Sequence, residues 1–144
     1  MNPSATESIL VASVLCNHDG ESMQKPGPST CTALAYADYW CSVEAGQLAK
    51  AIVRCTQKSF STRPNLVKAF LDPQWRVWID HPSFSPENSI PLSCAEVEAK
   101  PLLPIYRDRR LLKLVATAYE KMLSHPEATR QIALDLKIAL GDLT

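Results

Sequence analysis

A chain of 144 residues, 46% of them hydrophobic and 21% charged, has the size and composition of one globular domain that needs no disulfide or metal to fold. Equal numbers of acidic and basic residues give a formal net charge of zero, so the molecule as a whole is not drawn to nucleic acid or to anionic membranes. Four glycines argue against phosphate-binding loops and a sheet of tight hairpins, whereas eleven prolines predict several short elements with sharp boundaries.

The first thirty residues are expected to lie outside the main body of the fold. Residues 8–16, SILVASVLC, are apolar but too few to span a membrane, and Glu7 in front of them argues against a secretory signal. We interpret this run as a short strand or an ordered extended arm, followed by a flexible loop over 17–30. The predicted organisation is an arm and loop over 1–30 and a single helical domain over 31–144.

One long helix is predicted over residues 31–60. Small and medium side chains recur along it at spacings of four and three, which is typical of a face that packs closely on another helix. They are Cys41, Ala45, Leu48, Ile52, Cys55 and Ser59. On one continuous helix Cys41 and Cys55 would lie about 21 Å apart, too far for a disulfide. Since the five cysteines lack paired close spacing, we expect reduced thiols and a cytoplasmic protein.

The stretch QWRVWID, residues 74–80, fits either a helical turn or a strand. Asp72–Pro73 in front of it is a common way for a helix to begin, so we favour the helical turn. Its aromatic and basic side chains are candidates for a partner-binding surface, because Trp and Arg are favoured at the strongest points of interfaces. These candidates are Trp75, Arg76 and Trp78, grouped with Phe84. We favour the simpler interpretation that the tryptophans cover the core beneath the proline-rich loop over 80–92, with a partner-binding surface as the alternative.

Ser93 and Glu96 match the capping box that begins many helices. Cys94 would then occupy the first helical position, where the helix dipole favours a thiolate, so it is the candidate reactive thiol. The other chemical candidate is CNHDG, which holds Cys16 and His18. A zinc site needs about four ligands, and no second ligand pair accompanies this one, so we expect no metal and no cofactor.

Two helices over 106–123 and 127–140 are the clearest predicted elements. The first places Leu111, Val115, Ala118, Tyr119 and Met122 on one face. The sequence SHPE between them offers two starts for the second helix, a capping box or a proline in the first turn. The link is short, so we expect a helical hairpin.

The final stretch, ATRQIALDLKIALGDLT, resembles the first half of a helix-turn-helix over about 16 residues. The apolar places of that motif hold Ile132, Ala133, Leu136, Ile138 and Leu143. Lys137 stands where glycine is usual, and no second helix follows to read DNA, so we expect no DNA reading by this motif.

A helical wheel of the last helix shows two apolar facets rather than one. Leu134 and Ile138 lie opposite the side that would pack on the preceding helix. We predict that these two residues bind a partner protein or a second copy of the chain.

Four basic residues cluster at the start of the 106–123 helix: Arg107, Arg109, Arg110 and Lys113. Positive charge there opposes the helix dipole, which makes the cluster a candidate for contact with phosphates or an acidic partner. We favour the simpler interpretation, a face that is solvated or paired within the chain.

The sequence therefore predicts an all-α fold, an irregular bundle of four to six helices with an extended N-terminal arm and a C-terminal helical hairpin. The predicted function is a non-catalytic interaction or regulatory protein, an adaptor that acts through exposed apolar helix faces. The alternative is a nucleic-acid-binding regulator that uses the Arg107–Lys113 cluster. A small enzyme comes third, because no nucleophile motif or paired carboxylates with a required spacing were found.

Overall fold

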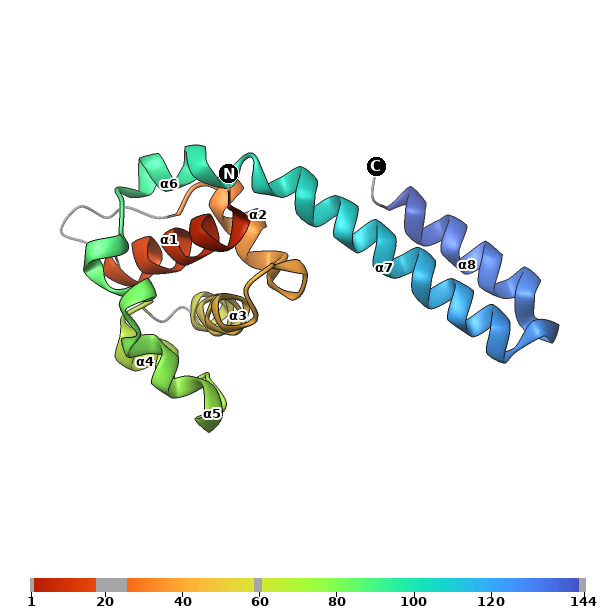
Figure 1. Cartoon of the computed structure of the whole chain (residues 1–144), viewed down its shortest axis with the longest axis horizontal. Coiled ribbons are helices and arrows are strands. Elements are labelled where there is room, and N and C mark those ends of the chain that lie inside the picture. The colour runs from red at the N-terminus through yellow and green to blue at the C-terminus, as the bar shows by residue number, and fades with distance from the viewer. Residues whose placement is uncertain (1, 18–25, 59–60, 143–144) are drawn as a thin grey trace. The chain divides into compact units, whose positions relative to one another are not determined.

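The computed structural model describes residues 2–17, 26–58 and 61–142, and every regular element in these ranges is helical, which confirms the predicted all-α class for them. The chain divides into two compact units, Met1–Leu103 and Pro104–Thr144. The helices of the first unit are α1 (Pro3–Cys16), α2 (Pro28–Ala35), η1 (Ala37–Tyr39), α3 (Val43–Gln57), α4 (Pro64–Lys68), α5 (Pro73–Arg76), η2 (Val77–Asp80), η3 (Pro82–Phe84), η4 (Pro86–Asn88) and α6 (Leu92–Ala99) (Figure 1). At the boundary α7 (Leu102–Ser124) begins, and η5 (Pro126–Ala128) and α8 (Thr129–Gly141) follow. The described ranges hold eight α-helices, more than the four to six expected.

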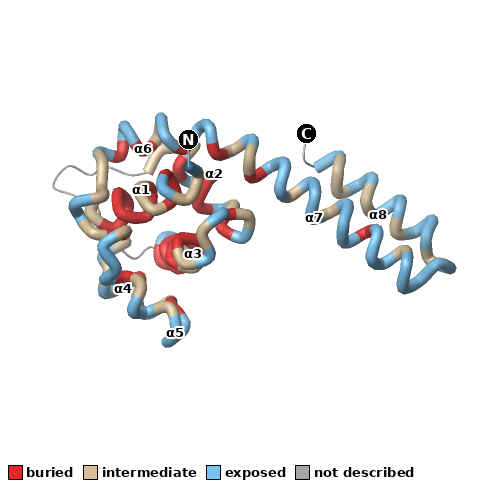
Figure 2. Tube along the Cα trace, viewed as in Figure 1, coloured by how far each residue is buried: buried red, intermediate tan, exposed pale blue. Residues whose placement is uncertain are grey.

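The segment expected to be a strand or an extended arm is helix α1. Asn2 caps this helix, since its Oδ1 accepts a hydrogen bond from Ser4 N at 3.1 Å, and Pro3 suits the first position. Helices α3 and α6 and the turns η3 and η4 contact α1, and Leu10 and Val11 are fully buried (Figure 2). Because α1 is enclosed on several sides, it has no polar face, and its sequence lacks the periodicity that reveals a surface helix.

The prediction of one long helix over 31–60 is also wrong. The chain leaves the α-helical conformation between Ala35, where α2 ends, and Val43, where α3 begins. The Glu7 carboxylate of α1 accepts two backbone hydrogen bonds there, from Cys41 N and Ser42 N, each at 2.9 Å. Glu7 is fully buried. Its carboxylate lies at the N-terminus of α3, where the helix dipole favours an anion. A side chain 34 residues away in the sequence thus fixes the start of α3.

Two local contacts complete this break. Ser42 caps α3, because its Oγ accepts a hydrogen bond from Ala45 N at 3.2 Å. The buried Trp40 donates from its Nε1 to the Ala33 carbonyl at 2.7 Å, a second hydrogen bond to an oxygen at the end of α2 that also accepts from Tyr36 N.

The packing face predicted from the sequence is buried along α3 itself, at Ala45, Leu48, Ile52 and Cys55. Cys41 precedes α3 and is exposed, so its placement on this face is corrected, and Ser59 lies outside the described residues. All five cysteines are free thiols in the structure.

In the middle of the chain, the short helices begin at prolines. Pro64 and Pro73 open α4 and α5, and the stretch 74–80 is helical, as Asp72–Pro73 predicts. Pro82 and Pro86 open the single turns η3 and η4. Proline suits the first position of a helix because it lacks an N–H group, and the first N–H groups of a helix have no partner within it.

Candidate functional site

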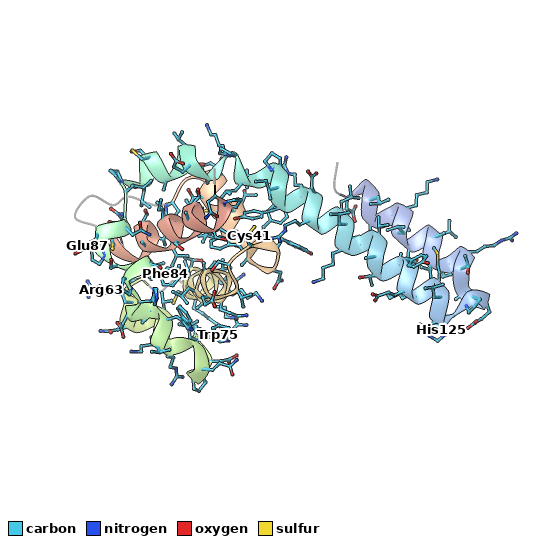
Figure 3. The ribbon with its side chains drawn as sticks, viewed as in Figure 1. Cys41, Arg63, Trp75, Phe84, Glu87 and His125 are labelled. Carbon is cyan, nitrogen blue, oxygen red and sulfur yellow. The ribbon has the colours of Figure 1, made fainter. Side chains whose placement is uncertain are left out.

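The second unit has almost no interior of its own. Helices α7 and α8 run in opposite directions and are joined by η5, with His125 at the turn (Figures 1 and 3). From Arg107 to Asp142, Ala118 is the only buried residue (Figure 2). Half-buried apolar side chains recur on one side of each helix: Leu114 and Met122 on α7, and Ile132, Leu136 and Leu140 on α8.

Five large apolar side chains of α7 remain exposed, and we call them the α7 apolar face. They are Leu111, Leu112, Val115, Tyr119 and Leu123, with exposed fractions of 40–68%. At about 100° per residue they span roughly 120° of the helix surface, next to the side that holds Ala118. The sequence predicts one packing face that Leu111, Val115 and Tyr119 share with Ala118, but only Ala118 among these four is buried. One neighbouring helix cannot cover so wide an apolar arc.

Leu134 and Ile138 form a second exposed surface, which we call the α8 facet. Their side chains are 55% and 67% exposed, whereas Ile132 and Leu136 on the opposite side of α8 are half-buried. The two-faceted wheel read from the sequence therefore describes the exposure of α8 correctly. Partner binding by the facet stays a prediction.

The four basic residues near the start of α7 do not form one flat patch. Arg107, Arg109 and Lys113 are exposed and Arg110 is half-buried. On the helical wheel they spread over roughly 160°. Arg109 and Lys113 also interact with other groups of the chain. A nucleic-acid duplex lies along one side of a helix. It could therefore contact fewer of these four cations than it could if all of them lay on that side.

The predicted aromatic surface is partly internal. Trp75 and Trp78 are half-buried, and the ring of Trp78 lies 4.9 Å from that of His81. The exposed Arg76 donates from Nε to the Leu71 carbonyl at 3.1 Å. Phe84 is 4% exposed and belongs to the core, which corrects its place in an exposed group (Figure 3). Trp75 and Trp78 are thus each partly buried and partly exposed to solvent.

The predicted capping box of Ser93 and Glu96 does not form. Helix α6 begins at Leu92 without a side-chain cap, so Cys94 lies within its first turn and is exposed. Glu96 instead accepts a hydrogen bond from Ser29 N at the start of α2. Gly27 makes room for it, because a Cβ at that residue would collide with the Glu96 carboxylate.

This contact gives Cys31 a distinctive environment. Partial burial raises the pKa of the Cys31 thiol, and the negative charge of Glu96 raises it further. Since the thiolate is the reactive form, we expect Cys31 to be alkylated slowly by iodoacetamide at pH 8 and faster as the pH rises. Glu96→Gln should move the midpoint of the pH–rate profile to lower pH, as followed by peptide mass spectrometry. Glu98→Gln, an exposed change on the same helix, serves as the control, and an equal midpoint in both variants would contradict the assignment.

The remaining chemical candidates find no site in the described ranges. The candidate CNHDG falls partly outside them, because His18 is not among the described residues. Within them, no group of three or more His, Cys, Asp or Glu side chains is placed to hold a metal ion. The helices described there are all too short or too polar to cross a membrane.

Comparison with known protein families finds no family model that matches the chain, and comparison with curated proteins finds no significant match.

Proposed function

We propose that this chain is a non-catalytic protein–protein interaction protein, of an adaptor or regulatory kind, that acts through the exposed apolar faces of its second unit. One observation carries the proposal. Between Arg107 and Asp142, seven large apolar side chains are 40% exposed or more, while a single alanine is buried. Because few apolar side chains of this range are buried, covering them with another surface would stabilise it.

The α8 facet supplies the sharpest test of this proposal. Covering a Leu or Ile side chain contributes about 1.5–3 kcal/mol, so Leu134 and Ile138 together can decide whether a partner stays bound. We expect Leu134→Glu/Ile138→Glu in the full-length tagged chain to reduce the protein retained on affinity capture about tenfold or more, because glutamate would have to be desolvated at the contact.

The matched control is Arg130→Gln/Lys137→Gln, which changes the net charge of α8 equally at exposed positions and keeps both apolar side chains. It should retain partners like the unaltered chain, and far-UV circular dichroism should show unchanged helix content in both variants. Equal retention by the facet variant and the control would contradict the proposal for this facet. Nucleic acid in the same eluate, released by salt and lost on charge reversal at Arg109 and Arg110, would favour the nucleic-acid alternative.

A further inference from the structure

We propose that the surface formed by α3, α4 and α5 binds a single strand of nucleic acid through its phosphates. This surface belongs to the first unit and is separate from the apolar faces of the second. Residues 50–76 hold six basic side chains and one acidic side chain, so they carry a net charge of +5 and the rest of the chain carries −5. The zero net charge of the whole molecule therefore conceals a strongly basic segment. We call its cations the α3–α5 basic surface: Lys50, Arg54, Lys58, Arg63, Lys68 and Arg76.

Three of these cations follow one side of α3. Lys50, Arg54 and Lys58 are spaced by four residues, on the side of the helix opposite the buried Ile52. Like charges at this spacing repel each other and destabilise a helix. Lys50 is neutralised by Asp38 at 2.5 Å, whereas neither Arg54 nor Lys58 forms an ion pair in the described part of the chain. A bound anion would relieve the repulsion that the fold leaves in place.

Two arginines from different helices meet just after α4. Arg54 of α3 donates from Nη1 to the Phe70 carbonyl at 3.3 Å, and Arg76 of α5 donates from Nε to the Leu71 carbonyl at 3.1 Å. Because these carbonyls belong to consecutive residues, the two guanidinium groups are held near each other. Arg76 also lacks an ion pair among the described residues. Each guanidinium keeps further N–H groups in a planar fork that matches the oxygens of a phosphate.

A half-buried aromatic side chain accompanies these cations. Trp75 precedes Arg76 in α5 and lies between α3 and α5 in Figure 3, and these two helices contact each other. Proteins bind single strands with this combination, because cations pair with the phosphates and an aromatic ring stacks on an unpaired base. An acidic peptide would use the cations alone, and the bases of a duplex are already stacked on one another. A single strand therefore uses both features of the surface.

Fluorescence anisotropy of a labelled single strand of about 20 nucleotides, titrated with the full chain, tests the surface. Arg54→Gln/Lys58→Gln/Arg76→Gln should raise the dissociation constant about tenfold or more at about 50 mM salt, because three cations without ion pairs are lost. Raising the salt to about 200 mM should weaken binding of the unaltered chain, and the slope of log affinity against log salt should be shallower in the triple variant.

The matched control is Lys121→Gln/Arg130→Gln/Lys137→Gln, which removes the same charge at exposed positions of the second unit. It should change the dissociation constant less than about threefold. Far-UV circular dichroism should show unchanged helix content in both triple variants. An equal loss of affinity in the two would overturn the inference, because it would show that only the charge of the whole chain matters.

Lys58→Gln keeps the test open if the triple variant loses helix content, because the Lys58 side chain makes no hydrogen bond or ion pair with the described residues. Alone it should lower the salt slope by about one. No change of anisotropy up to about 500 µM protein would overturn the inference. Tighter binding of the duplex of the same sequence, or equal competition by polyglutamate, would also overturn it. So would binding that Arg109→Gln/Arg110→Gln abolishes and the triple variant keeps.

Discussion

Replacing Glu7 with alanine is expected to lower the free energy of unfolding of the first unit by about 3 kcal/mol. The carboxylate is fully buried and accepts hydrogen bonds from Cys41 N and Ser42 N, so its loss leaves two backbone donors without an acceptor at the start of α3. Glu7→Gln keeps one acceptor oxygen but loses the charge, and about half of this effect is expected from it. Urea unfolding followed by circular dichroism measures both.

The control for Glu7 is Glu98→Ala, which removes an exposed carboxylate from α6 and should change the free energy of unfolding by less than about 0.5 kcal/mol. If Glu7→Ala cost no more than this control, the carboxylate would not hold the break between α2 and α3. Two glutamates of the same charge, one buried and one exposed, therefore separate the effect of burial from that of composition.

Leu10→Ala is expected to cost about 3 kcal/mol, because Leu10 is fully buried in α1 and its removal leaves a cavity that the packed neighbours only partly fill. Leu112→Ala makes the same chemical change on a helix where the side chain is 68% exposed. It should alter the free energy of unfolding of the dilute chain by less than about 0.5 kcal/mol. Chemical denaturation of both variants at low protein concentration makes the comparison.

Comparing Leu10→Ala with Leu112→Ala also distinguishes an extended N-terminal arm from a central N-terminal helix. An extended arm would tolerate Leu10→Ala about as well as Leu112→Ala, whereas a central helix would not. Equal unfolding midpoints would therefore contradict the placement of α1 in the core.

Elements with a local signal were predictable from the sequence. The starts at Pro64 and Pro73 follow from a residue that suits only the first turn, and the last two helices alternate apolar and polar sides over several turns. Even there the start of α7 lies four residues before the predicted one, because Pro104 is tolerated within its first turn. The exposed positions of Leu134 and Ile138 were predictable for the same local reason.

The α7 apolar face was only half visible in the sequence. The spacing of four between Leu111, Val115, Tyr119 and Leu123 was a signal for it. Three of these residues also fit the packing side with Ala118. A helical wheel shows how wide an apolar arc is, but it does not show which part of the arc a neighbouring helix covers. The exposure of each side chain settles that division.

The sequence by itself determined the all-α class of the described residues, the short elements that begin at prolines and the two facets of α8, because each depends on residues within a few turns of one another. Only the tertiary structure decided that residues 3–16 form a central helix, that Glu7 ends the expected long helix, and that Glu96 serves α2 rather than α6. These features depend on partners tens of residues away, and burial on all sides removes the periodicity from which a helix is read.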